Sequence, residues 1–349
     1  MAMWTVREQN LAALLTAGTF SERYVPVPVN GSGGFARWTG GTELARPLRA
    51  PRSEDALKAF CFSPTQVVAR YGGETKTAES EPVAPTPLRL VVGLRACDLA
   101  AVRYLDRVFT SPPGNDPFYE AGRASQTIVS VDCVRPHETC FCNLVGGQPW
   151  ATEGFDVNLT PIEGAYVIEA GSQAGRALIE AAGDCVVEAT PEDLARRDQV
   201  RHQAEEALAS ANGAFAADWK PRDGVAHDAD SAAWDRLGAD CVECGACTQI
   251  CPTCHCFFLC DRAADGRSFE RLRGWDSCLW SGYSRMAGMD RMKPNPRAQF
   301  RSRFANRFLH KFVWSPQQWD LLGCVGCGRC VEACPGAIDL RKVMCEVQV

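Results

Sequence analysis

The sequence predicts two domains, an α/β domain over residues 1–225 and a mostly helical domain over residues 226–349. Between about residues 88 and 189, short apolar runs alternate with segments of helical spacing, which is typical of an α/β layer. Beyond residue 240, two cysteine-rich runs flank an insert, residues 253–323, that we expect to be helical. Glycine and proline residues within residues 212–230 indicate the boundary between the domains.

Short β-rich runs and amphipathic segments define the expected elements of the first domain. The strand candidates are residues 88–93, 126–131, 166–169 and 185–189. Helices are expected over residues 97–109, 173–182 and 190–211, the last capped by Thr190. Nearer the N-terminus, we expect an amphipathic helix within residues 1–20, a short helix over residues 53–60 capped by Ser53, and a surface loop over residues 74–87.

The two cysteine runs share one spacing. They read Cys241-Val-Glu-Cys244-Gly-Ala-Cys247-Thr-Gln-Ile-Cys251-Pro252 and Cys324-Val-Gly-Cys327-Gly-Arg-Cys330-Val-Glu-Ala-Cys334-Pro335. Both match C-x₂-C-x₂-C-x₃-C-P, the pattern of bacterial two-cluster ferredoxins. Pairs of the form C-x₂-C also bind structural zinc, but two full runs with the trailing proline favour iron. The sequence therefore predicts two [4Fe-4S] clusters in a ferredoxin-like domain.

The fourth cysteine of each run has two possible partners. In two-cluster ferredoxins it crosses over to the other cluster. On this crossed rule, cluster 1 is held by Cys241, Cys244, Cys247 and Cys334. Cluster 2 is then held by Cys324, Cys327, Cys330 and Cys251. An uncrossed arrangement would keep each run together, and the sequence leaves both arrangements open.

Composition narrows the class of protein. The chain has 349 residues, 19 cysteines and a formal net charge of −5. In a long chain without a recognisable secretory signal, this many cysteines favours metal ligation over disulfides, and we expect a cytoplasmic location. The net charge gives no indication of nucleic-acid binding, and no apolar run approaches the roughly 20 residues that span a bilayer.

Four more cysteines lie in the α/β region and form a candidate third site. They are Cys97 and Cys133, each following a predicted strand, and the pair Cys140 and Cys142. Because the ends of neighbouring parallel strands converge at one edge of a sheet, these thiols could bind a third [4Fe-4S] cluster. The alternative is a set of unrelated buried cysteines, since no compact C-x₂-C pair occurs here.

A haem-like motif, a histidine and several further thiols each have a structural interpretation as well as a functional one. Cys251-Pro-Thr-Cys254-His255 matches a c-type haem motif, but Cys251 already belongs to a cluster run. His255 could tune a cluster or simply pack. Four further thiols in the insert could bind a ligand or pack as small apolar groups, and they are Cys254, Cys256, Cys260 and Cys278.

Arginine is frequent in the insert. A solvated helix face is the simpler interpretation, and the alternatives are docking to an acidic partner or compensation of cluster charge. The arginines concerned are Arg297, Arg301, Arg303 and Arg307. No G-x-G-x-x-G, P-loop or nucleophile triad is present, so we expect no dinucleotide site and no catalytic residue.

In combination, several segments resemble one family, the 4Fe-4S dicluster electron-transfer subunits of sulfhydrogenases (the β subunit) and of anaerobic sulfite reductases. The segments are Gly93-Leu-Arg-Ala-Cys97-Asp98-Leu-Ala-Ala101, Asp116-Pro-Phe-Tyr119, Asp132-Cys133, Thr139-Cys140-Phe-Cys142, Cys251-Pro-Thr-Cys-His-Cys256, Trp275-Asp-Ser-Cys278, Asn295-Pro-Arg297 and His310-Lys311-Phe312. The resemblance implies an electron-transfer subunit without a substrate centre of its own. It also implies partners: a flavin- and NAD(P)-binding diaphorase subunit, with NiFe hydrogenase small and large subunits or with sulfite reductase subunits.

Two hypotheses of different class follow. The first is an electron relay in a NiFe hydrogenase complex of the sulfhydrogenase type, or in an enzyme like anaerobic sulfite reductase. The second is a self-contained reductase whose α/β domain binds flavin or a small substrate. The missing dinucleotide fingerprint weighs against the second.

Overall fold

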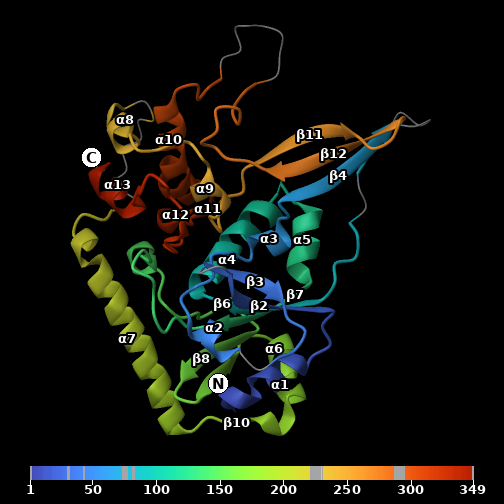
Figure 1. The fold of residues 1–349 in the computed structure, drawn as a ribbon, viewed down its shortest axis with the longest axis vertical. Coiled ribbons are helices and arrows are strands. Elements are labelled where there is room, and N and C mark those ends of the chain that lie inside the picture. The colour runs from blue at the N-terminus through green and yellow to red at the C-terminus, as the bar shows by residue number, and fades with distance from the viewer. Residues whose placement is uncertain are drawn as a thin grey trace.

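The computed structural model describes residues 2–29, 32–41, 44–72, 78–80, 83–112, 114–220, 229, 231–286 and 295–347. Figure 1 shows an α/β part, a second part coloured yellow to red and a projecting β-hairpin. The second part contains both cysteine runs and is called the cysteine-rich part. Part of the expected boundary stretch, residues 221–228 and 230, lies outside the described residues, and its first residues continue helix α7 to Ala216. The division into domains near residue 225 therefore stays a prediction. Among the described helices, none is long and apolar enough to cross a membrane.

A mixed eight-stranded sheet forms the centre of the α/β part. Its strands, in spatial order, are β10 (Val186–Glu188), β1 (Met3–Arg7), β9 (Ala165–Ala170), β8 (Val157–Ile162), β7 (Gln126–Val131), β6 (Arg89–Leu94), β2 (Glu22–Val29) and β3 (Ser32–Arg37). The run β2–β6–β7–β8 is parallel, and the other pairings are antiparallel. The predicted α/β class is thus confirmed, with a sheet that is parallel only in its middle.

Helices cover both faces of this sheet. Leu90 and Val92 of β6 join one core with α1 (Leu11–Thr16) and α6 (Gln173–Ala181). Val91 joins the other core with α4 (Ala96–Thr110) and α5 (Pro117–Ala124). A parallel strand buried on both faces carries an apolar run without alternation, which is why β6 and β7 were predictable.

Two predictions near the N-terminus are wrong. The expected helix within residues 1–20 is a strand, β1, followed by the short helix α1, because Val6 pairs with both β9 and β10 and helical spacing begins only at Leu11. The expected helix over residues 53–60 is only α3 (Lys58–Cys61). Ser53 does not cap it, because its hydroxyl donates to the Gly33 carbonyl oxygen.

The insert between the cysteine runs is not wholly helical. It begins with a hairpin of β11 (Phe257–Ala263) and β12 (Ser268–Trp275), and β12 pairs with β4 (Thr65–Gly72) of the α/β part. Strand β5 (Ala78–Ser80) completes this second sheet and lies within the expected loop 74–87, of which residues 74–77, 81 and 82 fall outside the described residues. Charges set the pairing, because Glu270 accepts from Arg262 at 2.8 Å and from Arg70 at 3.0 Å across neighbouring strands.

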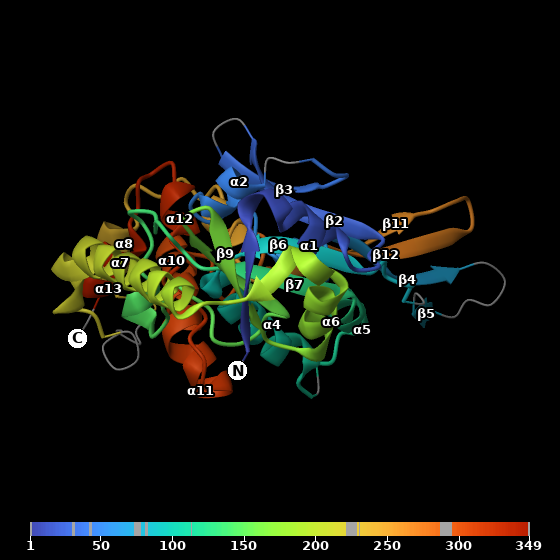
Figure 2. The same ribbon diagram turned by 90° about the horizontal axis from the view of Figure 1, so that it is seen from below.

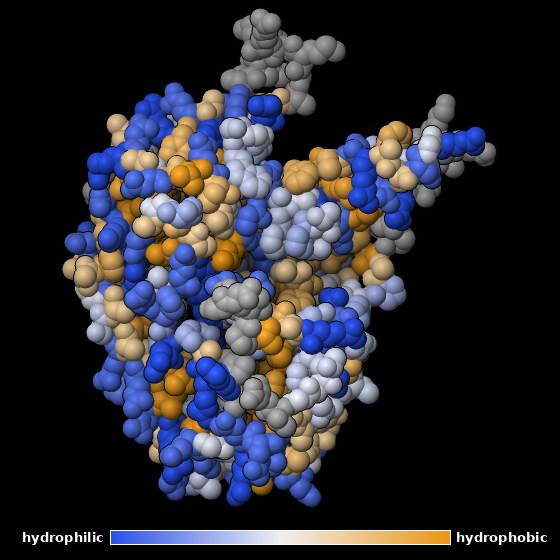
Figure 3. Space-filling view, in the orientation of Figure 1, coloured by the Kyte–Doolittle hydropathy of each residue, from blue (hydrophilic) through white to orange (hydrophobic). Residues whose placement is uncertain are grey.

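The remaining helices pack around a third core. They are α7 (Pro191–Ala216), α8 (Ala233–Leu237), α9 (Ala246–Gln249), α10 (Phe300–Leu309) with a π-helical turn over His310–Trp314, α11 (Ser315–Trp319), α12 (Arg329–Glu332) and α13 (Leu340–Glu346). Phenylalanines of α10 form its centre. Helix α7 flanks this part on one side, and the hairpin projects on the other (Figure 2). Apolar surface lies over the hairpin in Figure 3, in agreement with the exposure of Phe257, Phe258 and Leu259.

Candidate iron–sulfur sites

The four candidate cysteines of the α/β part, Cys97, Cys133, Cys140 and Cys142, converge on one cavity. Cys97 lies in the first turn of α4, directly after β6, and Cys133 directly follows the parallel neighbour β7. Cys140 and Cys142 come from the next loop and line the same cavity as the other two thiols. Burial raises the pKa of Cys133 to about 12, and the neighbouring Cys140 thiol adds to this shift. The convergence predicted from the strand ends therefore exists, which fits a polynuclear group bound by thiolates.

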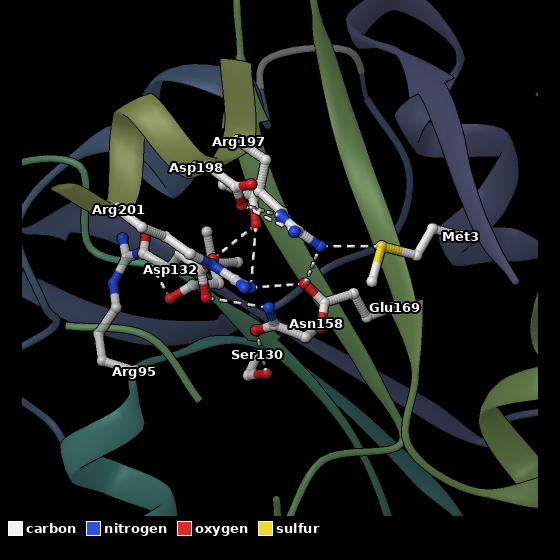
Figure 4. A network of polar contacts seen from close by, with 11 residues as sticks. Met3, Arg95, Ser130, Asp132, Asn158, Glu169, Arg197, Asp198 and Arg201 are labelled. Carbon is white, nitrogen blue, oxygen red and sulfur yellow. Dashed lines mark hydrogen bonds and ion pairs between the residues drawn. The ribbon is translucent and has the colours of Figure 1, made fainter. Parts of the chain in front are cut away.

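A buried polar network fixes the end of β7 next to Cys133 (Figure 4). The Asp132 side chain is only 1% exposed and accepts from Asn158 at 2.9 Å and from Arg201 Nε at 2.8 Å. Arg201 lies on α7 and also contacts Glu169 at 2.5 Å. A buried carboxylate needs such partners, so this network holds α7 against the sheet and orients the strand end that precedes Cys133.

Helix α7 also holds the loop that contains Cys140. The Asn212 side-chain amide donates to the Cys140 carbonyl oxygen at 2.9 Å and to Asn143 Oδ1 at 3.1 Å. Its own oxygen accepts from Arg341 Nη1 at 3.1 Å, and the same Nη1 donates to the Glu138 carbonyl oxygen. This buried asparagine therefore ties the cysteine loop to α7 and to α13.

The second cysteine run packs directly against that loop. The backbone N–H of Phe141 donates to the Gly326 carbonyl oxygen at 2.7 Å. Gly326 has φ +64°, and a Cβ on it would lie 2.5 Å from Cys142 Cα. Gly328 has φ +73°, and a Cβ there would lie 2.4 Å from the Thr139 carbonyl oxygen. Both glycines are thus required by a close backbone approach, a reason that the cysteine spacing alone does not reveal.

The two ferredoxin-type sites bring cysteines of both runs together. One cavity is lined by Cys241, Cys244 and Cys247 of the first run and by Cys330 and Cys334 of the second. Elsewhere, burial raises the pKa of Cys324 to about 12, and the nearby thiols of Cys251 and Cys327 add to this shift. Burial likewise raises the pKa of Cys330, with further contributions from Cys327, Cys251 and Cys324. Cys334 thus lies beside the first three cysteines of the first run, and Cys251 lies near Cys324 and Cys330 as well as near Cys247 of its own run.

Buried cations surround these thiols. Arg307 lines the Cys241 cavity, and its Nε has no hydrogen-bond partner among the described residues. Lys311 Nζ lies 3.3 Å from Cys251 Sγ, and Arg52 donates to the Cys327 carbonyl oxygen. Arg329 is fully buried and pairs with Asp98 at 2.7 Å. Buried cations are costly unless anions compensate them, and thiolate-bound clusters supply such anions. The side chains present therefore fit iron–sulfur clusters at all three sites.

The arginines of the insert do not form one solvated face. Arg303 is buried and pairs with Glu243, inside the first cysteine run, at 2.5 Å. Arg307 is buried among the cysteines, whereas Arg301 pairs with Asp235 near the surface. Of the interpretations left open by the sequence, compensation of buried negative charge is the one that matches Arg307.

Comparisons with known proteins agree with this chemistry. A family model for a 4Fe-4S dicluster domain matches residues 240–338. The chain is also 31% identical over 263 residues to the sulfhydrogenase 2 subunit beta of Pyrococcus furiosus, an alignment that covers 74% of each chain.

The Asp132 network predicts a large difference between two arginines of α7. Arg201→Met leaves the Asp132 carboxylate buried without its guanidinium, so we expect a loss of about 3 kcal/mol in the free energy of unfolding. Arg196→Met is the control, because Arg196 pairs with Glu192 on the surface and should cost less than about 0.5 kcal/mol. Urea unfolding of the anaerobically prepared chain measures both, and equal midpoints for the two variants would contradict the role assigned to Arg201.

Proposed function

Since the chain belongs to the 4Fe-4S dicluster family that includes the sulfhydrogenase β subunit, we propose that it relays electrons inside a cytoplasmic NiFe hydrogenase complex. Its partners are a flavin- and NAD(P)-binding diaphorase subunit on one side and the small and large hydrogenase subunits on the other. The observation that carries the proposal is that twelve cysteines gather at three adjoining sites, surrounded by buried cations. This arrangement suits electron storage and transfer.

Adjacency of the sites supports a relay. The Cys140 thiol contacts the Cys327 carbonyl oxygen at 3.7 Å, so the α/β site borders the site of the second run. Cys251 belongs to the first run by sequence and lies among the thiols of the second. The rate of electron transfer falls steeply with distance, so a relay needs sites that lie close together. The three neighbouring sites provide such a path from the edge of the sheet to the Cys241 cavity.

The chain's own groups set the conditions for this path. Bound clusters supply one-electron chemistry, whose potential depends on local charge, hydrogen bonds and exposure. Lys311 donates to Cys251 Sγ at 3.3 Å, to Thr253 Oγ1 at 3.0 Å and to the Gly323 carbonyl oxygen at 2.8 Å. This fixed ammonium group stabilises negative charge on the sulfur and favours the more reduced state of the neighbouring site.

Crossed ligation predicts which pairs of substitutions share one cluster. We expect Cys251→Ala with Cys327→Ala to remove about four irons per chain, because both thiols hold the same cubane. The matched double variant, Cys251→Ala with Cys241→Ala, should remove about eight. Iron and acid-labile sulfide assays on the anaerobically reconstituted full chain measure both values, and the reverse pattern would show the uncrossed arrangement.

The third site predicts a separate loss. Cys140→Ala with Cys142→Ala should remove about four irons per chain and leave the electron paramagnetic resonance signals of the two ferredoxin-type clusters in place. Cys61→Ser is the control, because Cys61 is buried and accepts a hydrogen bond from Gln126 at 3.1 Å, away from the three sites. Unchanged iron in the double variant would identify the four cysteines as packing residues.

The relay function predicts where activity resides. The purified chain, without other subunits, should show no oxidation of hydrogen or of NAD(P)H with a viologen dye. The tagged chain isolated anaerobically from its native host should bring hydrogenase and diaphorase activities with it. Flavin bound stoichiometrically to the isolated chain, with NAD(P)H turnover, would instead favour a self-contained reductase.

A further inference from the structure

A fourth group of sulfur atoms lies outside the three sites. Cys254, Cys256 and Cys278 line one small cavity in the cysteine-rich part, together with His255 and His310. None of the five belongs to the ligand sets of the three sites. Cys278 is 5% exposed, and the other two thiols are half-buried.

The β-hairpin of the insert assembles this cavity. Phe257, the first residue of β11, pairs with Trp275, the last residue of β12. The ladder continues one step further, because the Asp276 backbone N–H donates to the Cys256 carbonyl oxygen at 2.9 Å. Pairing at the base of the hairpin therefore brings Cys256 and Cys278 together, although they are far apart in the sequence.

The three thiols lie near other thiols as well as near the residues that line the cavity. The Cys256 and Cys278 thiols lie close enough for each to shift the pKa of the other, and the same holds for Cys254 and Cys251. By contrast, the buried thiol of Cys61 packs in the apolar core around α4. Three sulfur atoms that line one cavity are candidate ligands of a polynuclear group, whereas a packing role does not require them to share a cavity.

Two imidazoles complete the donors around the cavity. His255 Nδ1 lies 3.0 Å from the Thr253 carbonyl oxygen, so Nδ1 carries the proton and Nε2 keeps its lone pair. Metal-binding histidines characteristically have this arrangement. The His310 ring lies 5.5 Å from that of His255, centroid to centroid.

The charged side chains that line the cavity are positive, which favours the binding of a negatively charged group. Arg307 and Lys311 both line it and are both buried, and no carboxylate of the described residues lines it with them. Within the same described part of the chain, Arg307 Nε lacks a hydrogen-bond partner. Two buried cations without a carboxylate are stable only beside bound negative charge, which thiolates and an iron–sulfur core provide.

We propose that Cys254, Cys256 and Cys278 bind a fourth iron–sulfur cluster of the [4Fe-4S] class, with one imidazole of the His255–His310 pair on its remaining iron. A single metal ion fits less well, because no three His, Cys, Asp or Glu side chains of the described residues converge closely enough to hold one. The ferredoxin-type sites likewise have cysteines spaced too widely for a single ion. All proposed ligands belong to this chain, so the proposal does not depend on which partner subunits the chain has.

The new site adjoins the ferredoxin-type sites through Arg307, which lines both its cavity and the Cys241 cavity. The Arg307 guanidinium lies close to thiols of the first run, the second run and the new site, namely Cys247, Cys330, Cys254 and Cys251. The proximity of Cys254 to Cys251, whose thiol also lies near Cys324, joins the new site to the Cys324 site. A cluster here would be a fourth redox centre in the proposed electron-transfer path.

The test compares two double variants of the full chain, each lacking two thiols. Cys256→Ala with Cys278→Ala should lose about four irons and four sulfides per chain relative to the unmodified chain. Cys61→Ala with Cys260→Ala is the control, since it removes one buried thiol and one exposed thiol of the same hairpin, and it should lose none. Equal iron in the two double variants would overturn the proposal.

A second measurement leaves the new site unmodified and so avoids any folding defect there. In the Cys140→Ala, Cys142→Ala variant, two ferredoxin-type clusters account for about eight irons, and a cluster at the new site raises the total to about twelve. A value of about eight would overturn the proposal, whatever the occupancy of the α/β site.

The imidazole ligand has its own test. His255→Ala and His310→Ala are compared by potentiometric titration followed by electron paramagnetic resonance. The variant that lacks the ligand should change the g values and the midpoint potential of one centre, and the other should leave them close to the unmodified chain. Identical spectra for both variants and the unmodified chain would exclude an imidazole on the cluster.

Discussion

The close approach of the second cysteine run to the Cys140 loop is the contact on which the rest of the molecule depends. A backbone hydrogen bond of 2.7 Å joins Phe141 to Gly326, and two glycines with positive φ leave room for it. A side chain at either glycine would push the two backbones apart. Without this contact, the thiols at the edge of the sheet would be separated from those of the ferredoxin-type sites, and the path would break between them.

Charge compensation is the second constraint. Arg307, Lys311, Arg329 and Arg52 are buried close to thiols, yet the composition of the chain is acidic overall. Burying that many cations costs free energy unless thiolates and clusters compensate them. The cysteine-rich part is therefore expected to depend on its clusters for stability, as metal-coupled folding does in other small metal-binding domains.

The sequence predicted those features that depend on local spacing. The cluster runs follow from ligand geometry within twelve residues, and β6 and β7 follow from burial on both faces. Convergence of Cys97 and Cys133 was predictable because parallel neighbours end at one edge of the sheet. By contrast, β1 owes its place to antiparallel pairing with β9 and β10, which lie more than 150 residues away.

Long-range contacts also explain the features that the sequence did not predict. The insert was expected to be mostly helical, and its sequence does not reveal that its first part forms a hairpin. Their pairing with Glu270 and Asp261 exists only once the hairpin has formed beside β4. Burial of Arg303 and Arg307 likewise depends on the negative groups of the cysteine runs, which lie elsewhere in the sequence.

Helix α7 is largely polar, yet its side chains position parts of the α/β site. It has 26 residues, so it extends about 39 Å at 1.5 Å per residue. Its sequence shows no apolar face, but Arg201, Leu208 and Asn212 recur at helical spacing on one side. Arg201 binds Asp132, Leu208 lines the Cys97 cavity, and Asn212 holds the Cys140 loop. One helix thus fixes both the strand end and the loop that supply cysteines to the same cavity, so its register sets the geometry of the α/β site.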